Sequence, residues 1–403
     1  MITRKIFNDT ETAFSLKTNS ELDRAIFLFE TIDRPFMVKI GTAATKLALK
    51  LHLPVEPLIK KTIFNQFCGG TTEKDCIPVI EKMYSKKVHG VLDYSVEGKE
   101  KESEFDKALD RKINIVKFIK GKKELPFAVF KPTGIGRFAI WQKVSEKAEL
   151  NSAEETEWQN IRTRVQNICE AAYKNNIVLL ADAEESWMQG SVDALIEEMM
   201  VKYNTEKAII FNTLQCYRWD RLQYLKDLHQ RGVDQGFKVG AKLVRGAYLE
   251  KENERARKMG YLSPICETKE ATDVCFNSCL TYCLDHLEDL SVYIGSHNEV
   301  SNYLALQIME EKGIANDDDR IWFAQLYGMG EHISYNLAKK GYNVAKLVPF
   351  GPVRQVVPYL IRRAEENTSV KGQTGRELSL LYEERKRRNT KPKKTKPKNE
   401  LVS

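Results

Sequence analysis

Two neighbouring arginines near the end of the chain have a clear capacity for chemistry. The stretch YLIRRAEEN, residues 359–367, places Tyr359, Arg362, Arg363 and Glu366 on one face of a helix. The apolar residues of this stretch form a separate stripe that can dock the helix onto a core. Because two guanidinium groups can fork onto one anion, the polar face predicts a site for a small anion such as a carboxylate or a phosphate. The alternative is an exposed ion-pair face.

The elements that must position these arginines follow a regular pattern. Short β-branched runs alternate with amphipathic helical stretches between about residues 88 and 366. The expected strands are 88–94, 126–131, 177–183, 208–213, 236–245, 291–296, 320–326 and 344–350. A strand followed by a helix, repeated eight times, closes most economically as an α/β fold of the (β/α)8 TIM-like barrel type. A doubly wound open sheet is the alternative, but no GxGxxG follows the early strands.

A barrel carries its chemistry at the carboxyl ends of its strands. Polar residues stand there in this chain, and a lysine or aspartate within an apolar run is costly unless it is paired or used. Gly246 and Ala247 follow one strand and leave backbone room for a planar ligand, with Tyr248 beside them, although an ordinary turn would look the same. His297 fits either a ligand contact or a core histidine. The polar residues at the strand ends are Glu97, Lys131, Asp182, Asn212, Gln215, Lys242, Arg245, His297, Asn298 and Gln325.

Composition divides the chain into three parts. Residues 1–75 read as an N-terminal helical arm, packed on the barrel or on a second subunit, and 76–372 as the barrel. Residues 373–403 read as the end of a helix and a basic, disordered tail. The formal charge is +7, and nine lysines and arginines lie between Arg385 and Lys398, so the remainder carries −2. The tail is expected to aid solubility or to contact anionic lipid loosely; without interleaved aromatic residues it is not expected to bind nucleic acid.

The eight cysteines include no CxxC pair, and no secretory leader is evident, so a reduced intracellular setting is expected. Cys275, Cys279 and Cys283 recur every four residues, as small apolar residues on a core face do. No fourth ligand accompanies them, and no metal site is expected. No window is long and uncharged enough to cross a bilayer.

Several segments resemble the proline dehydrogenase family. They are AKLVRGAYLEKE, LLADAEES, FNTLQCY, GSHN, FAQLYGMG and above all VPFGPVRQVVPYLIRRAEENTSV, and the similarity spans roughly residues 65–372. The resemblance implies a distorted (β/α)8 barrel that holds FAD at its carboxyl face. It implies oxidation of L-proline to Δ1-pyrroline-5-carboxylate by hydride transfer to the flavin, with electrons passed to a membrane quinone. We expect a separate pyrroline-5-carboxylate dehydrogenase, because no second catalytic domain follows residue 372.

The resemblance also implies residue roles. Arg362, Arg363 and Lys131 would clamp the carboxylate of proline, and Tyr359, Leu326 and Tyr248 would pack around its ring. Asp182 and Glu97 would position Lys131 or its neighbours, and Glu366 would orient the arginines. The expected FAD contacts are Asn212, Lys242, Val244, Gly246, Ala247, Ser296, His297, Asn298, Gln325 and Arg363.

One residue departs from the family pattern. Leu347 stands where the family usually has a tyrosine that crowds the substrate ring, and related 4-hydroxyproline dehydrogenases have a smaller residue there. Leucine cannot pair with a hydroxyl group, so proline is the preferred substrate. A Schiff-base aldolase using Lys131 and Asp182 is a less favoured alternative, as is a barrel that only scaffolds a nucleic-acid-binding tail. The expected location is cytoplasmic, with peripheral contact at the inner face of a membrane, or on the matrix side in a eukaryote.

Overall fold

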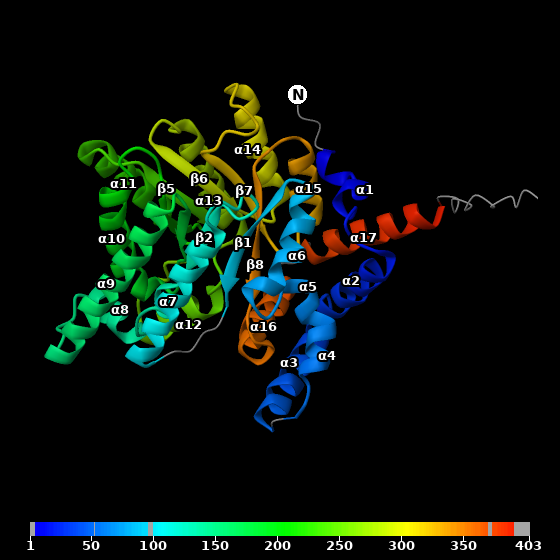
Figure 1. The fold of residues 1–403 in the computed structure, drawn as a ribbon, viewed down its shortest axis with the longest axis horizontal. Coiled ribbons are helices and arrows are strands. Elements are labelled where there is room, and N and C mark those ends of the chain that lie inside the picture. The colour runs from blue at the N-terminus through cyan, green and yellow to red at the C-terminus, as the bar shows by residue number, and fades with distance from the viewer. Residues whose placement is uncertain (1–4, 52, 96–99, 370–372, 391–403) are drawn as a thin grey trace, which may run out of the picture.

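Eight parallel strands close into one barrel, in the order in which they occur in the chain (Figure 1). The computed structural model describes residues 5–51, 53–95, 100–369 and 373–390. β1 pairs with β8 in register from Val88 opposite Val344 to Tyr94 opposite Phe350, which closes the ring. The (β/α)8 barrel predicted from the alternating pattern is therefore confirmed, and the open sheet is excluded.

Each predicted strand is present, with ends that differ from the expected ones by up to three residues. The strands are β1 Val88–Tyr94, β2 Phe127–Phe130, β3 Val178–Ala181, β4 Ile210–Gln215, β5 Val239–Val244, β6 Leu290–Gly295, β7 Ile321–Leu326 and β8 Val344–Phe350.

Helices follow the strands and surround the barrel. These are α7 Glu102–Ile119, α8 Phe138–Ser145, α9 Ser152–Lys174, α10 Ser186–Tyr203, α11 Arg221–Gln235, α12 Leu249–Met259, α13 Lys269–Asp285, α14 Glu299–Glu311, α15 Glu331–Lys339 and α16 Val353–Ser369. Before the barrel come α1 Thr10–Ala13, α2 Asn19–Ile32, α3 Pro35–Lys50, α4 Glu56–Ile59, α5 Asn65–Phe67 and α6 Glu73–Tyr84, and after it α17 Gln373–Thr390.

Alternate residues of each strand face opposite sides of the barrel wall, and both sides are buried. One hydrophobic cluster fills the interior and includes Phe127, Leu180, Phe211 and Ala345. A second, larger cluster lies between the strands and the surrounding helices. It contains the strand residues that alternate with those of the interior cluster. This alternation determines which polar residues near the strand ends point into the barrel.

The N-terminal arm packs on the barrel helix α16 and on the C-terminal helix α17 through a third apolar cluster. α2 begins with a capping box, in which the Thr18 hydroxyl accepts from the Glu21 N–H and the Glu21 carboxylate accepts from the Thr18 N–H. The arm was expected to pack either on the barrel or on a second subunit, and it packs on helices of its own chain. None of the helices in the described part of the chain combines bilayer-spanning length with sufficient apolar character.

The prediction that the basic stretch is disordered from residue 385 onward is wrong for its first part. α17 continues to Thr390, with Leu380 and Leu381 buried against the arm. The Arg388 guanidinium donates to the Glu384 carboxylate at 2.6 Å and to the carbonyl oxygen of Phe14 at 2.8 Å. These buried and paired groups stabilise a helix that composition alone did not indicate. Residues 391–403, the rest of the predicted tail, lie outside the described residues.

Candidate active site

The carboxyl ends of β1, β2, β3 and β5 bring ionisable side chains together at one mouth of the barrel. Asp93, Lys131, Asp182 and Lys242 have the parity of the interior residues on their strands. Lys112, from α7, reaches the same region, with its ammonium 3.9 Å from a carboxylate oxygen of Asp93. Burial lowers the pKa of Lys112, while Asp93 and Asp182 oppose that effect. The mouth thus holds cations and carboxylates that depend on one another for charge compensation.

Asp182 and Lys242 form the shortest of these contacts. The Lys242 ammonium donates to a carboxylate oxygen of Asp182 at 2.5 Å. The Lys242 side chain is only 9% exposed and that of Asp182 16%. Asp182 therefore has a defined partner on β5, and its expected role in positioning Lys131 or its neighbours stays a prediction.

A second carboxylate, Glu184, lies near Lys131. Its two oxygens accept from the backbone N–H and the hydroxyl of Thr133, at 2.9 and 2.7 Å. Burial raises the pKa of Glu184 to about 7, while the Lys131 charge and the two Thr133 bonds act to lower it. The same groups influence Tyr248: burial raises the pKa of its phenol, Glu184 adds to that effect, and Lys131 and Arg362 oppose it. Lys131, Tyr248 and Arg362 thus share one electrostatic neighbourhood, and their role around a small anion stays a prediction.

α16 carries the arginine face to the same mouth. The Arg363 guanidinium lies 5.2 Å from the ring centroid of Tyr359, which is buried in the cluster shared with the arm. Arg363 is also a charged neighbour of His297. Glu366 belongs to α16, but its side chain is not among those described, and Glu97 lies outside the described residues.

Several buried polar atoms at the mouth have no hydrogen-bond partner among the described residues. They include one carboxylate oxygen of Asp93, the side-chain oxygen of Gln215, at the end of β4, and the Nδ1 atom of His297, just after β6. His297 Nε2 accepts from the Leu326 N–H at 3.2 Å, which leaves the proton on Nδ1. Burial lowers the pKa of His297 to about 3, with further lowering by Lys346 and Arg363, so the ring is neutral. An unpaired acceptor and an unpaired donor in a buried site fit a bound polar ligand.

The turn after β5 exposes a stretch of backbone that a ligand could contact. Gly246 has φ +129°, and a Cβ there would lie 2.5 Å from the ring of Tyr217. Gly246 and Ala247 are exposed, and Val244 precedes them with interior parity. A flat ligand could lie along this backbone, which a larger residue at 246 would disturb.

Four predicted contact residues instead have hydrogen-bond partners within the protein. Asn212 has outward parity and donates to the Asp193 carboxylate at 2.9 Å, and Gln325 accepts from the Ser334 hydroxyl at 2.7 Å. Ser296 accepts from the Arg245 guanidinium at 2.9 Å, and Asn298 caps α14 through the Ser301 N–H. These side chains hold the loops of the mouth in place.

Sequence reasoning gave no role to Asp93 or Glu184, and it placed Gln215 at the mouth without a role. For Gln215 the signal was present: it shares the parity of Phe211, whereas Asn212 shares that of Ile210 and Leu214. Asp93 stands out as a carboxylate within an apolar strand. Nothing local marked Glu184, because its burial depends on the Thr133 loop.

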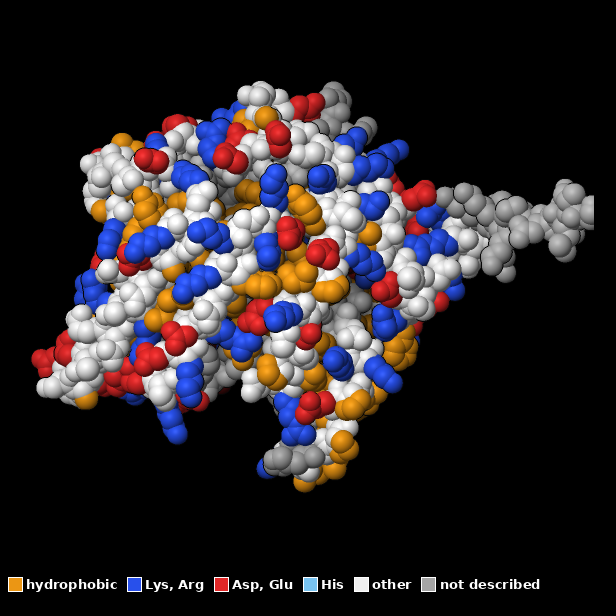
Figure 2. All heavy atoms as spheres, in the orientation of Figure 1, with side chains coloured by type: hydrophobic (Ala, Val, Ile, Leu, Met, Phe, Trp, Pro, Cys, Tyr) orange, Lys and Arg blue, Asp and Glu red, His pale blue; other side chains and the backbone are white. Residues whose placement is uncertain are grey.

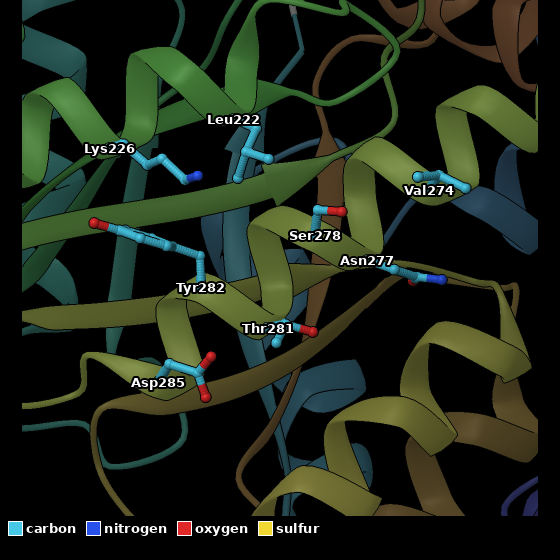
Figure 3. A pocket seen from close by; sticks show the side chains of 8 residues that line it. All are labelled: Leu222, Lys226, Val274, Asn277, Ser278, Thr281, Tyr282 and Asp285. Carbon is cyan, nitrogen blue, oxygen red and sulfur yellow. The ribbon is translucent and has the colours of Figure 1, made fainter.

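A groove of about 420 Å³ lies on the outer helices, between α11 and α13 (Figure 3). Its lining residues include Leu222, Lys226, Tyr282 and Asp285. None of its lining residues is at the strand ends, and the groove is therefore distinct from the mouth.

Comparison with known proteins decides the family. The family model described as proline dehydrogenase matches residues 76–376. The chain belongs to the proline dehydrogenase family. It is thus an oxidoreductase of this family, and the aldolase and scaffold alternatives fall away.

The chain is similar to a bacterial biosynthetic protein and to mitochondrial proline dehydrogenases. The carbapenem antibiotics biosynthesis protein CarD of Pectobacterium carotovorum subsp. carotovorum is 35% identical over 80% of this chain and 83% of its own length. The mitochondrial proline dehydrogenase 1 of Homo sapiens is 42% identical over 60% of this chain, and that of Arabidopsis thaliana 29% over 94%. The chain matches 41% of the human protein and 86% of the plant protein.

Solved structures share the barrel. Proline utilization A (PutA) from Bdellovibrio bacteriovorus, inactivated by N-propargylglycine, superposes with a TM-score of 0.66 at 18% identity. The match covers 94% of this chain and 39% of that protein. PutA from Corynebacterium freiburgense gives a TM-score of 0.64 at 20% identity, over 91% of this chain and 35% of that one. At these identities the likeness supports the fold alone.

Proposed function

We propose that this chain oxidises L-proline to Δ1-pyrroline-5-carboxylate at the barrel mouth, using bound FAD and passing the electrons to a quinone. The observation that carries the proposal is the cationic neighbourhood that Lys131 and Arg362 form around Tyr248 at the strand ends, with the Arg363–Tyr359 face on α16 beside it. A small carboxylate-bearing substrate suits that arrangement. Membership of the proline dehydrogenase family supports the oxidation of proline.

Arg362, Arg363 and Lys131 would hold the carboxylate of proline. Two guanidinium groups give directional bonds to both of its oxygens, and an ammonium adds a point charge. Tyr248, Leu326 and Tyr359 would enclose the apolar ring. Fixing one end of the substrate in this way restricts which carbon faces the cofactor, and such positioning supplies much of the rate enhancement.

Gln215, His297 and the backbone at Gly246 and Ala247 are the groups we propose for holding FAD. The unpaired oxygen of Gln215 can accept from a ligand N–H, and the Nδ1–H of neutral His297 can donate to a ligand oxygen. Lys242, held by Asp182, would contribute a fixed positive charge, Val244 an apolar contact and Arg363 a contact from α16. The bound flavin would accept a hydride from the substrate carbon next to the nitrogen. Asn212, Ser296, Asn298 and Gln325 would position these groups from behind.

Glu184 would adjust the charge of the mouth. With a pKa of about 7 it exchanges a proton near neutral pH, beside the ammonium of Lys131. When ionised it would compensate Lys131, and when protonated it would leave more positive charge for an incoming carboxylate. The roles expected for Glu97 and Glu366, as carboxylates that orient the cations, stay predictions.

The proposed partners follow from the proposed reaction. We propose a pyrroline-5-carboxylate dehydrogenase as the enzyme that consumes the product, and a quinone acceptor would lie in a membrane. We place the chain in the cytoplasm, peripherally at the inner membrane face, or on the matrix side in a eukaryote. Lipid contact by the basic tail remains a prediction for residues 391–403.

The test is the absorbance spectrum of the purified full chain. We expect a yellow preparation whose flavin bands bleach when L-proline is added without oxygen, and recover when a soluble quinone is supplied. A colourless protein that takes up no FAD would overturn the proposal. Bleaching without recovery would overturn the quinone acceptor alone.

The 4-hydroxyproline alternative depends on Leu347. This residue has interior parity on β8 and packs against the barrel's inner cluster, so it offers no partner to a hydroxyl group. An unpaired hydroxyl in a dry site costs about 1 to 3 kcal/mol, or roughly 5- to 150-fold in kcat/KM. We therefore expect kcat/KM for L-proline to exceed that for trans-4-hydroxy-L-proline. The reverse order would establish the alternative.

A further inference from the structure

Helix α3 of the N-terminal arm exposes an unusual amount of apolar surface. Phe36 is 71% exposed, Ile40 48%, Leu47 57% and Leu51 59%. Their spacings of four, seven and four residues place them in one stripe along the helix, which continues into Leu51 through its N–H bond to the Leu47 carbonyl. Exposed apolar side chains scattered singly are ordinary, but a continuous stripe of this kind marks an interaction surface.

The other face of α3 is already used. Val38 is 8% exposed, and the helix packs against α16 and α2. The exposed stripe therefore lies on a face of α3 that these contacts do not cover. Apolar residues of the neighbouring turns extend it, with Leu53 46% and Leu58 66% exposed.

The charged residues within the stripe's own segment are all cationic, while Asp33 and Glu56 flank that segment. Residues 34–55 contain Arg34, Lys39, Lys46 and Lys50 and no aspartate or glutamate. Lys39 and Lys50 are exposed, and Lys60 and Lys61 follow with exposed side chains. A helix with large apolar residues on one side and lysines at its border is typical of helices that lie in the headgroup region of a bilayer. Long lysine side chains can reach back to the phosphates while the apolar stripe is buried.

α3 and α4 form a prong at one end of the molecule, next to α16 (Figure 1). In Figure 2 hydrophobic side chains gather along this prong, with cationic and acidic ones beside them. The prong stands clear of the barrel body, so a flat surface can reach it. Its neighbour α16 carries Arg362 and Arg363, so a surface bound to α3 would lie near the helix that forms part of the mouth.

We propose that the exposed face of α3, centred on Phe36, Ile40 and Leu47, docks on an anionic lipid bilayer. The charge pattern argues against a second copy of this chain as the occupant, because a two-fold interface would bring the same cations of both copies together. It favours phospholipid headgroups, which carry the complementary charge. The inference concerns lipid binding alone and does not depend on the proposed reaction.

Vesicle sedimentation with the full chain tests the proposal. The probe is vesicles of phosphatidylserine and phosphatidylcholine in equal parts, compared with phosphatidylcholine alone. The variant Ile40→Glu/Leu47→Glu changes two exposed residues of the stripe. The matched control, Val274→Glu/Val300→Glu, adds the same charge at residues that are 65% and 67% exposed on α13 and α14.

We expect the wild-type chain to bind the anionic vesicles, with weaker binding as salt is raised. The α3 variant should raise the dissociation constant about tenfold or more, and the control less than about threefold. Lys39→Gln/Lys50→Gln should weaken binding about tenfold. Equal losses in the α3 variant and the control would overturn the proposal, since bulk charge would then explain both.

Two further outcomes would also overturn it. A chain ending at Thr390 that no longer binds, while the α3 variant binds as wild type, would assign the lipid contact to the tail. A dimer in lipid-free buffer that Ile40→Glu/Leu47→Glu converts to a monomer, measured by light scattering, would assign the stripe to a second copy. Thermal unfolding of each variant in the absence of lipid checks that these surface changes leave the fold intact.

Discussion

The ion pair between Asp182 and Lys242 allows a quantitative prediction for the mouth. Asp182→Asn preserves the shape of the side chain and removes its charge. Lys242 is 7% exposed, so its ammonium would remain buried beside a neutral amide. Removing one partner of a buried pair costs about 3 to 5 kcal/mol. Because the Asp182 side chain keeps 16% exposure, we expect the lower end, about 3 kcal/mol of unfolding free energy.

Urea unfolding at a fixed FAD concentration measures this cost, and an exposed pair provides the control. Glu254 and Lys258 on α12 are paired, with side chains 54% and 66% exposed. Glu254→Gln should leave the urea midpoint essentially unchanged, because water screens this exposed pair. Adding Lys242→Met to Asp182→Asn should recover most of the loss, because no buried charge is then left unpaired. If Asp182→Asn costs no more than Glu254→Gln, the reasoning about a buried, mutually dependent pair is refuted.

Three further predictions concern the turn, the mouth carboxylate and the C-terminal helix. Gly246→Ala should lower stability by about 2 kcal/mol, because φ is +129° and the new Cβ meets the Tyr217 ring. It should also weaken FAD binding, and unfolding and flavin titration measure the two effects. Unchanged FAD affinity would exclude the backbone contact. For Glu184, the folded carboxyl keeps its proton up to a pKa of about 7, whereas the unfolded one loses it near 4.5, so its contribution should fall by about 2 to 3 kcal/mol as pH rises between those values. Glu184→Gln should flatten that part of the stability profile, and an identical profile would contradict the assignment. Arg388→Gln should cost about 1 to 3 kcal/mol in urea unfolding, because the fully buried Glu384 and the Phe14 carbonyl lose a donor; no loss would mean that α17 contributes little.

The fold could be predicted from the sequence because its signals are local and repeated. Runs such as IVLLADA and RIWFAQL are short, apolar and separated by helical patterns, and eight of them permit few arrangements. The motif around Arg362 and Arg363 likewise carried its own evidence. The extension of the C-terminal helix to Thr390 was missed because its stability comes from contacts with the distant arm, such as that of Arg388 with Phe14. Composition cannot report such contacts.

The side of the barrel wall that each polar residue faces was harder to predict. Strands of a parallel barrel are buried on both sides, so they lack the apolar–polar alternation that reveals parity in half-exposed sheets. Lys346 illustrates the difficulty: it is fully buried between β8 and α15, where its ammonium donates to the Met329 carbonyl at 2.6 Å. Its neighbour Leu347 faces the interior. The partner of Asp182 was unpredictable for a similar reason, since several lysines converge on the mouth.

The central claim is that paired guanidinium groups on α16 hold the carboxylate of the substrate. The most direct test is anaerobic flavin reduction by L-proline in Arg362→Gln/Arg363→Gln, with flavin content measured on the same sample. Losing two charge-assisted contacts should raise the apparent Kd for proline at least about a hundredfold. We predict that the variant binds proline this weakly and that the wild-type chain saturates. A variant that retains flavin and is reduced by proline at the wild-type concentration dependence would contradict the account.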